Sequence, residues 1–359
     1  ALSCDEDGKL NVDGTAGTST HTSTHVYTLS DGSYYLDGNL NLKYHINISG
    51  TVNLCLNGHS IGKPSSDSCA SITVTGDNNA VLNLCDCSAG AAGKVNSVTI
   101  TGGTVNLFGG TISNPIADGE TEPENGGAVY MSYGGSVFNM YGGKIAGSKA
   151  QHGGGVYLSG GAFNMSGGEI SGNVSTANNG GGGVYMTGRT SIFNLYDGAK
   201  ITGNEGQNSA GGGVCLYGGG TFNMTGGEIT KNRGTGVSGS GAGVYLGVGS
   251  GIFNMNGGTI GENEVSYSSG GGVYLYSGEF NMTNGTISGN MTGRDGGGVY
   301  AAAGFTMYDG EISGNSISNS DAQGGGGVAI GGQSFTMYGG SITNNLTAQG
   351  GGVYVGSRS

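Results

Sequence analysis

A unit of 25 to 30 residues that recurs to the end of the chain constrains this protein more than any other feature of its sequence. One copy reads GGGVYLSGGAFNMSGGEISGN at residues 153–173. Its three apolar runs contain Val156, Phe163 and Ile170, and each run alternates apolar and polar residues with the two-residue period of a β-strand. Glycine and asparagine separate the runs, where the chain must turn. The unit therefore predicts three short strands per repeat.

The three anchors recur together through the second part of the chain. The valines are Val129, Val156, Val184, Val214, Val244, Val273, Val299, Val328 and Val353. The phenylalanines are Phe138, Phe163, Phe193, Phe222, Phe253, Phe280, Phe305 and Phe335. The isoleucines are Ile145, Ile170, Ile201, Ile229, Ile260, Ile287, Ile312 and Ile342. The copies differ mainly between the isoleucine and the next glycine run, so we expect variable loops at 174–180, 205–210, 233–240, 264–269 and 316–323.

This pattern excludes a helical solenoid, because a glycine before each valine would destabilise a helix by about 1 kcal/mol. It predicts an all-β fold, a right-handed parallel β-helix of about 12 coils in which each strand pairs with its counterpart one coil away. We assign residues 1–25 to an N-terminal entry segment or cap, 26–125 to irregular first coils and 126–359 to regular repeats. Because a solenoid needs terminal caps, the end of the sequence within a repeat predicts a longer natural protein or another element over the last coil.

Three further columns of the repeat carry predictions. A corner with positive φ is expected two residues after each methionine position, at Gly142, Gly167, Asp197, Gly226, Gly257, Asn284, Asp309 and Gly339. A stacked asparagine ladder is expected three residues after each isoleucine, at Asn173, Asn204, Asn232, Asn263, Asn290, Asn315 and Asn345. An exposed ion-pair ladder is expected before the isoleucines, at Lys144, Glu169, Lys200 and Glu228.

The charge balance limits the partners. The net charge is -12, with only 12 lysines and arginines, so the chain is not suited to nucleic acid or anionic membranes. The same charge disfavours a polyanionic substrate such as pectate. No apolar run approaches membrane-spanning length, so we expect no membrane insertion. The sequence does not indicate an oligomeric state.

The cysteines concentrate in the first 87 residues. Cys55 and Cys85 occupy the same position in VNLCLNG (52–58) and LNLCDCS (82–88), so they are candidates for a disulfide between neighbouring coils. Buried free thiols and a metal site are the alternatives. Cys215 replaces a tyrosine of the repeat and is expected to be unpaired.

An outward tyrosine column follows the valines and supplies the candidate ligand-binding residues. Its members are Tyr130, Tyr157, Tyr185, Tyr245, Tyr274, Tyr300 and Tyr354, interrupted at Cys215 and Ala329; the first six are the candidates. Such rings can stack on sugars, or they can stabilise the sheet by cross-strand contacts. An outward asparagine column, Asn139, Asn164, Asn194, Asn223, Asn254 and Asn281, is expected to form hydrogen-bonding ladders or to contact a glycan.

No catalytic residue can be assigned. A glycosidase needs two carboxylates at a defined separation, and the possible members are Asp197, Asp309, Glu169, Glu228 and Glu311. Their places at the glycine-type corner and in the charge column explain them locally. The acidic loop with Asp118, Glu120, Glu122 and Glu124 is a candidate Ca²⁺ site or a solvated loop. Otherwise no cofactor and no other metal are expected.

The motifs LCLNGHSI (54–61), LNLCDCS (82–88) and the GGGVY…FNMxGGxIxGN unit resemble right-handed parallel β-helix proteins of the pectin-lyase-like superfamily. More narrowly, they resemble the glycine-rich repeat regions of secreted and cell-surface bacterial proteins. The resemblance covers nearly the whole chain and implies a fold more than a function. Polysaccharide lyases of this superfamily use a basic residue and often acidic Ca²⁺ ligands, whereas Arg189, Arg233 and Arg294 here fall in variable loops.

These features together favour a non-catalytic scaffold or adhesin, secreted or on the cell surface, that binds a glycan or a host surface protein. The first alternative is a carbohydrate-active enzyme, a polysaccharide lyase or glycoside hydrolase. The second is a structural stalk that spaces another domain from the cell wall.

Overall fold

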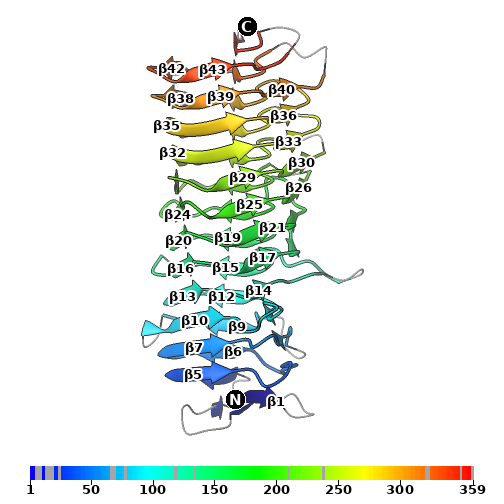
Figure 1. Cartoon of the computed structure of the whole chain (residues 1–359), viewed down its shortest axis with the longest axis vertical. Helices are drawn as coiled ribbons and strands as arrows, with labels where there is room; N and C mark the ends of the chain where they lie inside the picture. Colours follow the sequence, from blue (N-terminus) through cyan, green and yellow to red (C-terminus); the bar gives the residue numbers. More distant parts are fainter. Residues whose placement is uncertain are drawn as a thin grey trace.

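The computed structural model describes residues 1–4, 10–12, 20–22, 26–64, 70–76, 79–116, 120–132, 134–208, 210–236, 239–319, 324–347 and 350–356. Over these residues the chain forms one elongated stack of β-coils, with the N-terminus at one end and the C-terminus at the other (Figure 1). The predicted all-β parallel solenoid is confirmed. None of the described residues forms a helix long and apolar enough to span a bilayer.

The valine anchors form one continuous sheet, which we call the tyrosine sheet after its outward column. Its strands are β3 (Thr20–Thr22), β4 (Val26–Leu29), β6 (Ile46–Ile48), β9 (Ile72–Val74), β12 (Val98–Ile100), β15 (Val129–Met131), β19 (Val156–Leu158), β23 (Val184–Met186), β27 (Val214–Leu216), β31 (Val244–Leu246), β34 (Val273–Leu275), β37 (Val299–Ala301), β41 (Val328–Ile330) and β44 (Val353–Val355). All pair in parallel except β3, which is antiparallel to β4. This number of strands agrees approximately with the predicted count of about 12 coils.

The phenylalanine and isoleucine anchors share a second sheet, which we call the phenylalanine sheet. Its strands are β5 (Gly32–Tyr35), β7 (Thr51–Cys55), β8 (Ser60–Ile61), β10 (Val81–Cys85), β11 (Lys94–Val95), β13 (Thr104–Leu107), β14 (Thr111–Ile112), β16 (Val137–Met140), β17 (Lys144–Ala146), β20 (Ala162–Met165), β21 (Glu169–Ser171), β24 (Ile192–Leu195), β25 (Lys200–Thr202), β28 (Thr221–Met224), β29 (Glu228–Thr230), β32 (Ile252–Gly261), β35 (Glu279–Ser288), β38 (Gly304–Met307), β39 (Glu311–Ser313), β42 (Phe335–Met337) and β43 (Ser341–Thr343). In β32 and β35 the two anchors lie on one uninterrupted strand.

A fourth short strand follows the isoleucine in the regular coils, where the sequence predicted only variable loops. These strands are β18 (Lys149–Ala150), β22 (Val174–Ser175), β26 (Glu205–Gln207), β30 (Arg233–Thr235), β33 (Glu264–Val265), β36 (Met291–Thr292) and β40 (Ser316–Ile317). Their side chains vary from coil to coil, so no apolar period marks them. At the N-terminal end β1 (Leu2–Cys4) and β2 (Leu10–Val12) form a separate antiparallel pair.

The anchors pair like for like and line a dry core. Phe138, Phe163 and Phe193 are fully buried in successive coils, and their rings stack with centroids 5.0 and 4.8 Å apart. The stack continues to Phe335 at centroid distances of 4.7 to 4.9 Å. Burying each ring removes a large apolar surface from water. An isolated coil cannot bury its apolar face, so each coil is stabilised by packing against the neighbouring coils.

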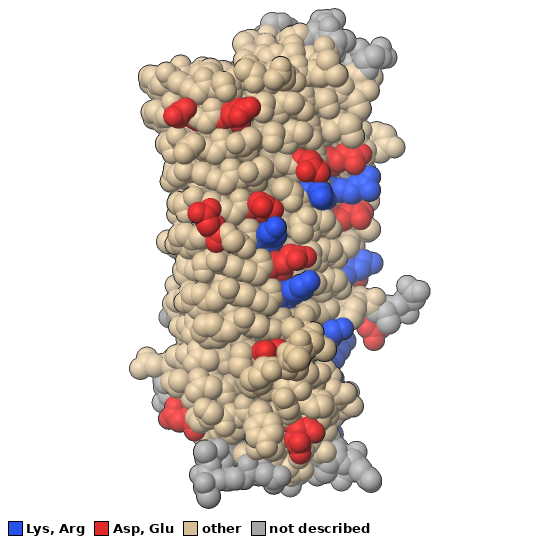
Figure 2. Space-filling view, viewed as in Figure 1, with Lys and Arg blue, Asp and Glu red and all other residues tan. Residues whose placement is uncertain are grey.

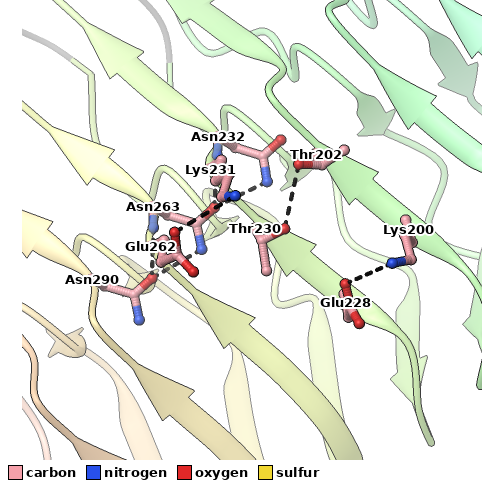
Figure 3. A network of polar contacts seen from close by, with 9 residues as sticks. All are labelled: Lys200, Thr202, Glu228, Thr230, Lys231, Asn232, Glu262, Asn263 and Asn290. Atoms are coloured by element: carbon pink, nitrogen blue, oxygen red, sulfur yellow. Dashed lines mark hydrogen bonds and ion pairs between the residues drawn. The ribbon is translucent and has the colours of Figure 1, made fainter.

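The predicted inner asparagine ladder is present, and it is buried. Asn173, Asn204, Asn232, Asn263, Asn290 and Asn315 are 0% exposed. Each amide nitrogen donates to the carbonyl of an isoleucine, as Asn232 does to Ile201. It also donates to the amide oxygen of the next asparagine, as from Asn232 to Asn263 and from Asn263 to Asn290 (Figure 3). The predicted position of the positive-φ corner was wrong by one residue. In the regular coils the residue with positive φ is the glycine that follows the predicted position, as at Gly143 and Gly168, where φ is 72° and 78°.

Charged side chains are few. On the face shown in Figure 2 the lysines and arginines lie toward one side with acidic residues between them, and other acidic residues lie apart. Lys144 pairs with Glu169 at 3.9 Å and Lys200 with Glu228 at 3.3 Å, as the alternating column predicted (Figure 3). These pairs are exposed, so they set register more than stability. The outward asparagines also form the predicted ladder, which begins earlier, at Asn53, and runs to Asn281.

Candidate functional site

The tyrosine column lies on the outer face of the tyrosine sheet, because each tyrosine alternates with two inward apolar residues of its strand. Tyr130, Tyr157 and Tyr185 are register partners on β15, β19 and β23, and their ring centroids lie 5.3 and 5.5 Å apart, with the first pair stacked and the second tilted by 31°. Tyr245, Tyr274 and Tyr300 form a second run at 5.4 and 4.9 Å. The structure therefore brings the six candidate residues into two stacks of three.

The gap between the two stacks is closed. Cys215 is the register partner of both Tyr185 and Tyr245 and is fully buried. The ring of Tyr217 fills the space, 6.2 Å from that of Tyr185. Tyr185 and Tyr245 are consequently only 5% and 8% exposed, and burial raises the pKa of both hydroxyls and of the Cys215 thiol. These two tyrosines cannot offer a ring face to a ligand.

The gap at Ala329 is open. Ala329 lies between Tyr300 and Tyr354 in register and forms the buried floor of a notch of about 150 Å³. Asp295, Ile330, Gly331 and Gly356 complete the lining. Burial raises the pKa of Tyr274, which stacks on Tyr300, to about 12. Because the register partner of Tyr300 on the next coil is Ala329, the second stack ends at the ring of Tyr300, which no tyrosine of that coil covers.

The first stack also has an uncovered ring, that of Tyr130, at the end nearer the N-terminus. Thr99 is the register partner of Tyr130 on the preceding coil, so no ring of the column covers that side of Tyr130. A recess of about 590 Å³ lies here, lined among others by Thr99, Tyr130, Asn114, Glu120 and Glu122. It places hydrogen-bonding side chains beside an aromatic ring, which is the composition of a small polar ligand site.

One wall of the recess is the segment 120–126, which is fastened to the next coil. The carboxylate of Glu122 pairs with Lys149 at 2.5 Å and accepts a hydrogen bond from the Thr176 hydroxyl at 2.6 Å. The amides of Gln151 and His152 donate to the carbonyls of Pro123 and Glu124, each at 2.9 Å. The hydrogen bonds from Lys149 and Thr176 hold the pKa of Glu122 below its ordinary value.

Acid is expected to release this wall. Because the folded-state pKa of Glu122 is lowered, the anchoring of the segment is complete above the carboxylate pKa of the unfolded chain, about 4.3, and is lost as the pH falls through the folded-state value. Hydrogen exchange of the Gly126, Gln151 and His152 amides, which join the segment to the next coil, should show the loss of protection once corrected for intrinsic rates between pH 7 and pH 3. Glu122→Gln should exchange faster at pH 7 already. Protection that is equal in both proteins and independent of pH would contradict the role of Glu122.

The other acidic candidates lie away from the recess or are engaged. Asp118 lies outside the described residues, and with Glu122 engaged as above we do not propose Ca²⁺ here. Glu169 and Glu228 face lysines on the phenylalanine sheet. Asp309 lies at a corner, where its carboxylate accepts a hydrogen bond from the Gly310 amide at 2.8 Å.

The predicted disulfide partner of Cys55 was wrong. Cys55 and Cys85 are register partners as expected, but Cys55 is bonded to Cys87, with Cα atoms 6.1 Å apart. Register partners in a parallel sheet lie only about 4.8 Å apart, at the short end of the disulfide range, whereas 6.1 Å is near its usual value. Cys85 remains a free, half-buried thiol, and Cys215 is free as predicted.

Sequence reasoning missed a second aromatic column at the corner of the phenylalanine sheet. Phe108 stacks on Tyr141 at 5.1 Å and Tyr308 on Tyr338 at 5.2 Å, and all four rings are about half exposed or more. The signal was available, since each of these residues directly follows the methionine or leucine anchor. None of these four rings lines one of the recesses described above, whereas a typical binding site is concave.

Comparison with protein-family models, with curated proteins and with solved structures found no match for this chain. The parallel solenoid is therefore shown by the structure alone. The relation to the pectin-lyase-like superfamily and to glycine-rich repeat proteins stays a resemblance.

Proposed function

We propose that this protein is a non-catalytic scaffold, secreted or on the cell surface, that binds a glycan at the two ends of its tyrosine column. The observation that carries the proposal is that Tyr130 and Tyr300 each end a stack and each border a recess. An aromatic face beside hydrogen-bonding groups suits a sugar, which has an apolar ring face and polar edges.

The notch at Ala329 fits one ring. Tyr300 and Tyr354 are two coils apart, so their backbones are separated by about 9.6 Å, twice the strand spacing. A sugar ring placed between the two tyrosines can contact both, because carbon atoms in van der Waals contact lie about 3.5 to 4 Å apart. Asp295 supplies a hydrogen-bond acceptor at the edge.

The recess beside Tyr130 is larger and can hold more than one sugar unit. Asn96 and Asn114, which lie in its lining, are joined by a hydrogen bond of 3.2 Å, and the Asn114 amide also donates to the Gly127 carbonyl at 2.9 Å. Lys63 and Glu120 add one charge of each sign. With a net charge of -12, the chain suits a neutral glycan better than a polyanionic one.

The disulfide between Cys55 and Cys87 supports a secreted or surface location, because such bonds persist in oxidising compartments. The alternative ligand of such a scaffold is a host surface protein. A structural stalk that binds no ligand is the remaining alternative.

A carbohydrate-active enzyme is the alternative function. A glycosidase requires one carboxylic acid with a raised pKa. The pKa of Glu122, one of the carboxylates in the larger recess, is instead lowered by Lys149 and Thr176. This direction favours a structural role for Glu122 over general-acid catalysis.

Extending the tyrosine column is expected to block binding without unfolding the chain. Thr99→Tyr would cover Tyr130, and Ala329→Tyr would fill the notch, at positions whose counterparts in other coils are tyrosine. We expect glycans captured on an array by the unaltered protein to bind at least tenfold more weakly to the double variant. Each single variant should lose only the ligands of its own end.

Thr225→Tyr serves as the matched control, because it adds an exposed ring to the other aromatic column. It should leave binding unchanged. Equal glycan binding by the double variant and the unaltered protein would contradict the site, and an array without any bound glycan would contradict the function. Release of reducing ends from a polysaccharide panel would instead identify the enzyme.

A further inference from the structure

Three cysteine sulfurs meet at one corner of the early coils, and none of them lines either recess of the candidate glycan site. Cys55 and Cys85 are the last residues of β7 and β10 and lie side by side in register. Cys87 follows two residues later, and its Sγ lies 3.8 Å from that of Cys85. All three Sγ atoms lie within 4.8 Å of one another.

Hydrogen bonds to Asp86 hold the turn that carries Cys85 and Cys87. Between them, Asp86 accepts hydrogen bonds from the amides of Gly58 and Gly93 at 2.8 and 2.7 Å and from the Ser88 hydroxyl at 3.0 Å. These bonds use both carboxylate oxygens and hold the turn against the two adjoining segments. Two cysteines two residues apart are thereby fixed on the same side as Cys55.

The surroundings of Cys55 suit a thiolate, whereas burial and the Asp86 carboxylate raise the pKa of the Cys85 thiol. The amide of Cys87 donates a hydrogen bond to the Sγ of Cys55 at 3.2 Å. Amide donors of this kind stabilise the negative charge of a ligating sulfur. Cys87 is exposed while Cys55 and Cys85 are half-buried, so the corner is open to an ion and to one solvent ligand.

We propose that the reduced form of Cys55, Cys85 and Cys87 is a binding site for one thiophilic cation, Zn²⁺ or Cu⁺. Tetrahedral Zn²⁺ with bonds of about 2.3 Å places sulfurs about 3.8 Å apart. The separation of Cys85 and Cys87 has this value, and all three sulfurs lie within 4.8 Å of one another. The sulfurs of Cys55 and Cys87 are bonded to each other in this form and must move apart on reduction. Soft thiolate ligands select these ions over Ca²⁺ or Mg²⁺.

The disulfide makes the site conditional on redox state. In the oxidised chain Cys55 and Cys87 are bonded to each other, so Cys85 alone offers a thiol. A phosphine with one water molecule reduces the bond to two thiols and becomes a phosphine oxide. The cation then displaces three protons, one from each thiol, as three metal–sulfur bonds form. Oxidation closes the site and reduction opens it.

The test uses the full chain with Cys4, Cys69 and Cys215 replaced by alanine, so that only the three proposed ligands remain; Cys69 lies outside the described residues. After phosphine reduction and anaerobic desalting, the protein is titrated with Cd²⁺, followed by the thiolate charge-transfer band, and with Zn²⁺ against a chromophoric chelator. We expect one equivalent of each ion per reduced chain and none per oxidised chain.

Cys85→Ser in this background is the deciding variant. It retains the bond between Cys55 and Cys87, so its oxidised form should fold, as circular dichroism can verify. Its reduced form should bind Cd²⁺ at least tenfold more weakly. Undiminished binding by reduced Cys85→Ser, equal binding by the oxidised chain, or no binding by the reduced chain would each overturn the proposal.

Discussion

Replacing Asn232 by leucine is expected to lower the free energy of unfolding by about 4 kcal/mol. The amide oxygen of Asn232 accepts bonds from the backbone and side-chain nitrogens of Asn204, both at 3.0 Å, and its amide nitrogen donates to the Ile201 carbonyl at 3.0 Å. Leucine would leave the Asn204 backbone amide and the Ile201 carbonyl buried without these partners. Each such group costs about 1 to 3 kcal/mol.

Chemical denaturation followed by circular dichroism measures this loss, and the chain supplies its own control. Asn223 belongs to the outward ladder of the same repeat and bonds Asn194 and Asn254 at 2.9 and 3.0 Å. It is only half-buried, so water can replace lost partners, and Thr306 shows that threonine fits this column. Asn223→Thr should therefore cost less than about 1 kcal/mol. Equal costs for the two variants would show that burial of the inner ladder does not matter.

The ladders also show how much the sequence could predict. The three anchors and their register followed from the repeat, because a period of two and a step of 7 residues between Phe and Ile in all copies but one favour stacking like on like. The inner asparagines were recognisable as a column. Their complete burial was not, since the same residue type forms the half-buried outward ladder, and only the direction of the side chain separates Asn232 from Asn223.

The candidate site was less accessible to sequence reasoning. The tyrosine column and both of its interruptions were visible, but Cys215 and Ala329 looked alike. The structure separates them because Tyr217 fills one gap, whereas the other remains a notch. Likewise, the cysteine register was predictable, whereas pairing with Cys87 depends on the turn that Asp86 holds. Such outcomes depend on loops and turns, which the repeat does not constrain.

From Val156 to Val328, the glycine directly before each valine anchor is expected to be as intolerant as the core anchors, and Gly243→Ala tests it. A Cβ at Gly243 would lie 2.5 Å from the Gly272 carbonyl oxygen of the next coil and 2.8 Å from the Ile260 side chain. No positive φ is involved, so the obstacle is the close approach of two coils. Overpacking of this kind costs about 3 kcal/mol, because the neighbouring backbone must move.

Gly304→Ala is the matched control, since a Cβ there meets nothing within 4 Å and its register partner is Glu279. It should leave the free energy of unfolding unchanged or raise it by up to about 1 kcal/mol, because alanine restricts the unfolded chain. Denaturation of both variants under one condition decides the matter. If Gly243→Ala is as stable as Gly304→Ala, the glycine runs serve flexibility rather than coil spacing. If it is much less stable, the glycine richness of the chain follows from the strand-to-strand distance that also sets the width of the notch between Tyr300 and Tyr354.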